Sequence, residues 1–160
     1  MVAETATEWW TQVGAGYATD ALRLALAGLC GAVVGWQRER HEKAAGLRTH
    51  MLLAIGACLF TLVAIRINAD DITRLLQGMV TGTGFLAGGV IFREGVSVRG
   101  LTTAAGLWVM GAIGTAIGIG DYFLGVLATL LTFIVLSVVL GLENRAARRV
   151  AGDAPQGPAE

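Results

Sequence analysis

The chain has 160 residues, of which 54% are hydrophobic and only 15% are charged. Soluble domains usually carry about 25% charged residues, so this composition indicates a membrane protein. Twelve basic and twelve acidic side chains cancel, and a net charge of zero gives no reason to expect a nucleic-acid partner.

Five apolar segments follow one another along the chain, separated by charged residues. They cover residues 21–36, 51–65, 78–92, 101–119 and 122–142. At about 1.5 Å per residue, the last two can cross a hydrocarbon core of about 30 Å. The first three are shorter and need polar flanks to complete a span; in the third, Asp70 or Asp71 would cap the helix. The predicted fold class is all-α, a polytopic membrane helix bundle of about five transmembrane helices over residues 17–142.

Basic residues are distributed unequally between the two faces that five spans would create. One face carries nine of them: Arg38, Arg40, Lys43, Arg48, Arg93, Arg99, Arg145, Arg148 and Arg149. The other carries Arg66 and Arg74, with Arg23 just inside the first span. Because basic loops stay on the cytoplasmic side, we predict an N-terminus outside and a C-terminus in the cytoplasm. Residues 1–16 are then an extracytoplasmic segment, and residues 143–160 a cytoplasmic tail, first basic and then disordered.

Glycine is unusually frequent, with 23 residues, about twice the usual share of roughly 7%. Several pairs within the apolar segments are four residues apart: Gly31 and Gly35, Gly78 and Gly82, Gly84 and Gly88, Gly114 and Gly118. Small residues at this spacing let helix backbones approach closely in lipid, which predicts tight helix packing. The alternative is that the glycines keep a narrow aqueous or ion path open.

The third apolar segment has a polar and small face. Its members alternate steps of three and four and therefore share one side of a helix: Arg74, Gln77, Thr81, Gly84 and Gly88. Such a face should turn toward protein or water instead of lipid. We therefore expect this segment at the centre of the bundle.

The stretch "WQRERHEKAAGLRTH" is the densest polar region. Gly46 is expected to end the first helix in the left-handed conformation, and Glu39 and Lys43 form a favourable helical pair. One interpretation is a basic surface facing anionic lipid. The other is a structured cytoplasmic polar cluster shared with the loop after the third segment, with members Arg38, Glu39, Lys43, Arg48, Thr49, His50, Arg93, Glu94, Arg99, Thr102 and Thr103.

Catalytic chemistry has little support in the sequence. A nucleophile needs a base and an orienting group, but the only histidines, His41 and His50, belong to one loop region. Cys30 and Cys58 lie inside apolar segments, where cysteine behaves as a small buried hydrophobe. We predict no catalytic residues and no enzyme.

No cofactor is expected, although a Mg²⁺ site stays open because this ion needs only one or two carboxylates. The candidates lie on the predicted outer face: Asp20, Asp70, Asp71 and Asp121. The alternative is that these acids cap helices or lie in solvated loops.

Three stretches together resemble one known family. "GWQRERHEKAAGLRTH", "GTGFLAGGVIFREG" and "VRGLTTAAGLW" occur in the order and spacing of the bacterial MgtC/SapB membrane proteins, and the resemblance runs from about Leu22 to Leu142. The chain departs from the family pattern at Gln37, where the family commonly has Glu, and at Ala87 and Gly88, where it commonly has Gly-Ala. The first departure removes a carboxylate that could bind an ion or a basic side chain.

The resemblance implies a multi-pass protein of the bacterial inner membrane that is linked to growth at low magnesium. Family members look like regulators of other membrane machinery, including ATP synthase. We therefore expect a non-enzymatic modulator of magnesium homeostasis that contacts the lipid bilayer, other inner-membrane proteins and, as a further option, its own copies. The alternative is a transporter or channel for magnesium or another ion, lined by Arg74, Gln77 and Thr81. Well-studied members continue into a cytoplasmic C-terminal domain, whereas we expect only a short tail here.

Overall fold

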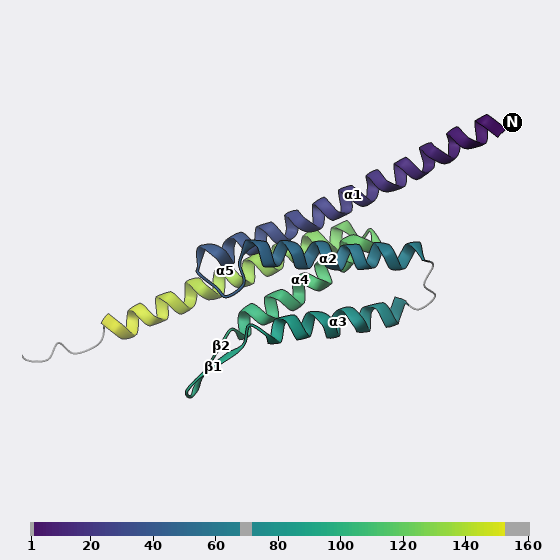
Figure 1. Ribbon diagram of the computed structural model, residues 1–160. Coiled ribbons are helices and arrows are strands. Elements are labelled where there is room, and N and C mark those ends of the chain that lie inside the picture. Colours follow the sequence, from purple (N-terminus) through teal and green to yellow (C-terminus); the bar gives the residue numbers. More distant parts are fainter. Residues whose placement is uncertain (1, 68–71, 153–160) are drawn as a thin grey trace, which may run out of the picture.

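The computed structural model describes residues 2–67 and 72–152, with side chains for 16–67, 73–93 and 95–138. These residues form five helices and one short β-hairpin (Figure 1). The elements are α1 (Val2–Arg40), α2 (Leu47–Arg66), α3 (Ile72–Gly88), β1 (Phe92–Glu94), β2 (Ser97–Arg99), α4 (Leu101–Ile119) and α5 (Tyr122–Gly152). The predicted all-α bundle is confirmed.

Among the residues with described side chains, three helices are both long and apolar enough to span a membrane. Gly16–Arg40 of α1, α2 and α4 are long and apolar enough to cross a bilayer. Helix α3 has 17 residues, and the part of α5 with described side chains, Tyr122–Val138, is a shorter apolar helix. The α1–α2 connection and the hairpin lie at one end of the bundle, and the α4–α5 turn lies at the other (Figure 1). We call the end that carries the α1–α2 connection and the hairpin the basic end.

The two chain ends extend these helices. Helix α1 begins at Val2, so most of the segment predicted at residues 1–16 is helical, and it reaches beyond the other helices (Figure 1). Helix α5 continues to Gly152, which places the first part of the predicted tail in a helix. Residues 153–160, like Asp70 and Asp71, lie outside the described part of the chain.

Helix α4 lies at the centre of the bundle. It packs against α1, α2, α3 and α5, and the largest buried side chains include its Leu107, Met110, Ile113 and Ile117, none more than 2% exposed. The expectation that the third apolar segment is central is therefore wrong. The physical reason is that α4 is apolar or small on all its sides, as a buried helix must be, whereas α3 packs on α4 with one side only.

Glycines let α1, α2 and α4 pack closely. A Cβ added at Gly31 would lie 2.6 Å from the carbonyl oxygen of His50. At Gly118 it would lie 2.7 Å from Cβ of Thr61, and at Gly114 it would collide with the carbonyl oxygen of Ala54. No real Cβ atom tolerates such distances, so at these positions the interpretation of close helix approach is confirmed.

The glycines of α3 behave differently. A Cβ added at Gly78, Gly82, Gly84 or Gly88 would meet nothing within 4 Å among the described residues. Close packing within the chain therefore does not account for them, and the expectation of tight helix contact is not met here. The same spacing of four thus describes two different environments.

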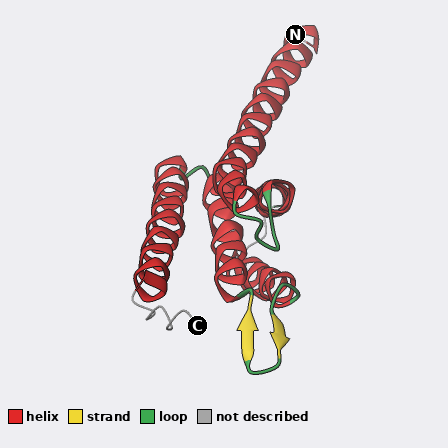
Figure 2. Cartoon of the chain, turned by 90° about the vertical axis from the view of Figure 1, so that its left-hand side faces the viewer, coloured by secondary structure: helices red, strands yellow, loops and turns green. Residues whose placement is uncertain are grey.

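The connections correct two further expectations. Helix α1 ends at Arg40, and the left-handed residue beyond it is Glu42, with φ of 50°. Gly46 instead precedes α2 with an extended φ of −108°, so its predicted role as a left-handed helix end is wrong. The chain after α3 pairs as an antiparallel hairpin, with Phe92 opposite Arg99, and it projects beyond the helices (Figure 2). Gly95 turns the hairpin with φ of +61°.

Candidate functional site

Four polar side chains are buried at the basic end, where α1 ends and where α2 and α4 begin. They are Gln37, Arg38, His50 and Thr103, with exposed fractions of 6%, 4%, 0% and 4%. We call this set the buried polar cluster. Burial of a charged or polar side chain is costly unless it finds hydrogen-bonding partners, so the partners of each member decide what the cluster can do.

Arg38 joins two helices that are distant in the sequence. Its Nη2 donates a hydrogen bond of 2.9 Å to Oγ1 of Thr103, which lies in the first turn of α4. That turn follows Gly100, whose φ of 92° is left-handed. The hydrogen bond from a guanidinium is charge-assisted and stronger than a neutral one, so it fixes the end of α1 against the start of α4.

His50 is oriented by the backbone that precedes α2. Its Nδ1 lies 2.8 Å from the carbonyl oxygen of Gly46, and because a carbonyl only accepts, Nδ1 must carry the proton. In the neutral ring, Nε2 is then an acceptor. Nε2 is buried and has no partner among the described residues. Glycines make room around this ring, since a Cβ at Gly106 would lie 3.9 Å from Nε2 and one at Gly35 only 3.0 Å from Cβ of His50.

Gln37 contributes two more unpartnered atoms. Both its Oε1 and its Nε2 are buried without a hydrogen bond in the described part of the chain. Buried polar atoms in proteins nearly always have a partner, which is often a water molecule or a ligand. The cluster therefore offers one amide donor and two acceptors, from Gln37 and His50, for a small polar partner.

Glu39 has a structural role beside the cluster. Its Oε2 accepts a hydrogen bond of 2.6 Å from the backbone N–H of Leu47 and so caps the start of α2. A Cβ at Gly46 would lie 2.6 Å from that oxygen, so a larger residue there would require the Glu39 side chain to shift. The expected helical pair of Glu39 with Lys43 is wrong, because α1 ends before Lys43.

The predicted cytoplasmic polar cluster is thus only partly assembled. Three of its members, Arg38, His50 and Thr103, come together. The others whose side chains are described, besides Glu39, lie exposed at the same end of the molecule: Lys43, Arg48, Thr49, Arg93, Arg99 and Thr102. The side chain of Glu94 is outside the described part. Sequence reasoning did not include Gln37 in the site, although a polar residue beside Arg38 at the end of an apolar helix was a usable signal.

The polar and small face of α3 lies on the surface of the chain. All its members are exposed: Arg74, Gln77, Thr81, Gly84 and Gly88. Thr81 donates a hydrogen bond of 2.8 Å to the backbone carbonyl of Gln77, within its own helix. The side of α3 that packs on α4 carries Thr83 instead, whose hydroxyl lies where a side chain at Gly111 would be.

At the opposite end, the described acids have other partners. Asp20 forms an ion pair with Arg66, and Oδ1 of Asp121 accepts a hydrogen bond of 3.0 Å from the N–H of Leu124 and caps α5. Arg23 donates to the carbonyl of Gly118 at 2.9 Å. No group of three or more histidine, cysteine or acidic residues that could hold a metal lies among the described residues. The interpretation of Asp121 as a helix cap is confirmed.

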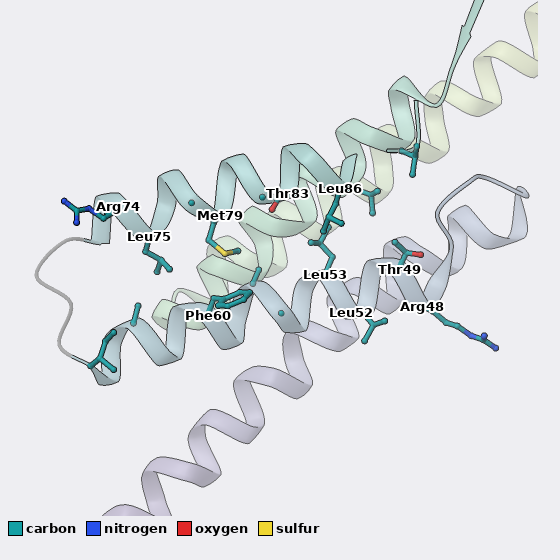
Figure 3. A pocket seen from close by; sticks show the side chains of 18 residues that line it. Arg48, Thr49, Leu52, Leu53, Phe60, Arg74, Leu75, Met79, Thr83 and Leu86 are labelled. Atoms are coloured by element: carbon teal, nitrogen blue, oxygen red, sulfur yellow. The ribbon is translucent and has the colours of Figure 1, made fainter. Parts of the chain in front are cut away.

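A long groove separates α2 from α3 (Figure 3). Both helices pack on α4 and make few contacts with each other. The groove has a volume of about 1160 Å³, and Leu107 of α4 contributes to its floor. Arg48 and Thr49 stand at its basic end and Arg74 at the other (Figure 3).

In a comparison with known protein families, residues 24–145 match the model of the MgtC family. The chain is similar to Protein MgtC of Salmonella typhimurium LT2, with 43% identity over 110 residues, 69% of this chain and 48% of that protein. It is 45% identical over 114 residues to slr0014 of Synechocystis, 71% of this chain and 49% of the other. It is 40% identical over 126 residues to the "Putative magnesium transporter YhiD" of Escherichia coli K12, and the match covers 73% of this chain and 59% of that protein. The chain spans about half the length of the curated relatives it matches, and no solved structure matches it.

Proposed function

Because this chain belongs to the MgtC family of membrane proteins, we propose that it is a non-enzymatic modulator of magnesium homeostasis in the bacterial inner membrane. In this proposal it acts by binding other membrane proteins and does not carry the ion itself. The chain is oriented with its basic end in the cytoplasm, in keeping with the excess of basic residues there.

The position of the polar face of α3 is the observation that supports a modulator best. Gln77 and Thr81 lie on the surface of the bundle, where a neighbouring protein can reach them. An ion path within one chain would need space between the helices, but at Gly111, Gly114 and Gly118 helix α4 packs so closely against α2 and α3 that not even a Cβ atom would fit. A surface of this kind suits helix-to-helix recognition in lipid.

Transport of magnesium is the second candidate, and the name of the Escherichia coli relative favours it. The exposed face of α3 would then line a path between two chains. Arg74 lies on that face, and its guanidinium carries charge of the same sign as the ion that would pass it. We therefore rank this candidate second.

Proteoliposomes separate the two candidates. We expect vesicles that contain the purified chain and a magnesium-sensitive dye to show no more influx than protein-free vesicles. In a bacterial strain from which the gene for this chain has been deleted, expression of the chain should restore growth at low magnesium. The double variant Gln77→Leu, Thr81→Val should not restore it. Influx that these two substitutions abolish would overturn the ranking in favour of transport.

A further inference from the structure

The groove between α2 and α3 is wide because of glycines on both walls. A Cβ added at Gly56 of α2, or at Gly78 or Gly82 of α3, would meet nothing within 4 Å among the described residues. All three residues line the groove. Glycine weakens a helix relative to alanine, and here no contact with the described part of the chain requires it. The space that the glycines leave is therefore available to a molecule outside the chain.

The walls of the groove are apolar and face outward. Leu52 and Phe60 of α2 are 70% and 63% exposed, and Leu86 of α3 is 57% exposed. Helix α2 is one of the helices that can span a membrane, so the groove opens onto the hydrocarbon of the bilayer. Its lining is mostly apolar and includes the flexible side chain of Met79 (Figure 3), and such a lining can adapt to acyl chains.

The basic end of the groove has the opposite character. Arg48 and Thr49, in the first turn of α2, line this mouth. The guanidinium of Arg48 is exposed and makes no ion pair within the described part of the chain. No acidic side chain is among the described residues that line the groove. Figure 3 shows the Arg48 side chain directed away from α3, and its long flexible stem lets the guanidinium reach a phosphate group at this mouth, where Thr49 supplies a hydroxyl.

The groove is apolar along most of its length, with Arg48 and Thr49 at one end and Arg74 at the other, and such a lining suits an amphipathic anion. We propose that the groove between α2 and α3 binds one anionic phospholipid, with its phosphate on Arg48 and Thr49 and its acyl chains between the helices. A transmembrane helix would fill only the apolar part and would leave Arg48 without an anion. The site is separate from the proposed modulator role and does not depend on it.

Native mass spectrometry of the full chain in mild detergent tests the lipid site. We expect one phosphatidylglycerol to remain bound per chain, in preference to a phosphatidylcholine with the same acyl chains. Arg48→Gln should lower the apparent affinity for phosphatidylglycerol about tenfold, the effect of losing one charge-assisted hydrogen bond. The matched control is Arg99→Gln, which removes the same charge from exposed β2 at the same end and should leave binding unchanged. Equal retention of the two lipids, or equal loss in both variants, would overturn the proposal.

The apolar part of the site has its own pair of variants. Gly82→Leu places a side chain in the groove, whereas Gly84→Leu places one on α3 away from it, and both positions have open space beside them. We expect Gly82→Leu to lose the lipid and Gly84→Leu to keep it, with the same melting temperature for both in lipid-free detergent. Lipid retained by Gly82→Leu would contradict the proposal. A dimer of the unchanged chain that is lost in Gly82→Leu would also contradict the proposal, because a second copy of the chain would then occupy the groove.

Discussion

Helices α1, α2 and α4 on one side, and α3 on the other, use glycine in opposite ways. In the first group, atoms of a neighbouring helix occupy the space that a Cβ atom of the glycine would need. At Gly31 these are backbone atoms of His50. In α3, the space beside Gly78 is open. The spacing of four residues is the same in both regions. Spacing alone therefore indicates that a helix can be approached closely, and only the fold determines whether the approaching molecule belongs to the same chain.

The largest expected difference between the two regions comes from truncating side chains. Ile113 of α4 is 1% exposed, whereas Leu86 of α3 is 57% exposed. We expect Ile113→Ala to lower the free energy of unfolding by about 3 kcal/mol, because it leaves a cavity that the helices around it cannot fill. Leu86→Ala should cost no more than about 0.5 kcal/mol. Unfolding by denaturant in one detergent measures both, and similar losses would mean that α3 is as tightly packed as α4.

Two threonines sharpen the comparison at the level of hydrogen bonds. Thr103→Val removes the acceptor of buried Arg38 and should cost about 2 kcal/mol, since a buried charged donor is left with one partner fewer. Thr81→Val removes only a bond to its own helix on an exposed surface, so its effect should stay within about 0.5 kcal/mol. The same unfolding measurement applies. If Thr103→Val left the free energy of unfolding unchanged, the hydrogen bond between Arg38 and α4 would not contribute to stability.

Gln37 is a buried residue of the packed region whose substitution, unlike the others, should not destabilise the protein. Its buried amide has no partner among the described residues, so Gln37→Met should leave stability unchanged or raise it by about 1 kcal/mol. If the amide binds a small polar partner instead, the variant should fail to restore growth at low magnesium although it is folded. A variant that is both unstable and inactive would assign Gln37 a purely structural role. Gln37→Glu serves as the control that keeps a polar group in place.

Much of the fold could be predicted from the sequence because hydropathy alone determines which segments are helices in a membrane protein. The fourth segment was predicted at residues 101–119 and is observed as Leu101–Ile119, since Gly100 and Gly120 bound it sharply. The third was predicted to continue to residue 92 but ends at Gly88. The hairpin that follows has strands of only three residues, too short to show the alternation that identifies a strand.

The candidate site could be predicted only in part, because burial depends on which helices are neighbours. Arg38, Arg48 and His50 look equivalent in the sequence, yet two are buried and Arg48 is exposed at the groove. The members of the predicted polar face of α3 lie in one helix and are all exposed. The prediction that this helix lies at the centre was wrong. Polar faces avoid lipid, but this rule does not specify whether they then contact the same chain or another protein.

One matched pair of glycine variants tests the contrast between the two regions most directly. Melting temperatures of Gly114→Ala and Gly78→Ala, measured side by side in the same phospholipid and detergent, isolate the effect of one methyl group. We expect Gly114→Ala to lower the melting temperature strongly, because its Cβ would collide with the backbone of Ala54 in α2. Gly78→Ala should raise it slightly, through the higher helix propensity of alanine. Equal destabilisation by both substitutions would contradict the account, since α3 would then be packed within the chain as closely as α4.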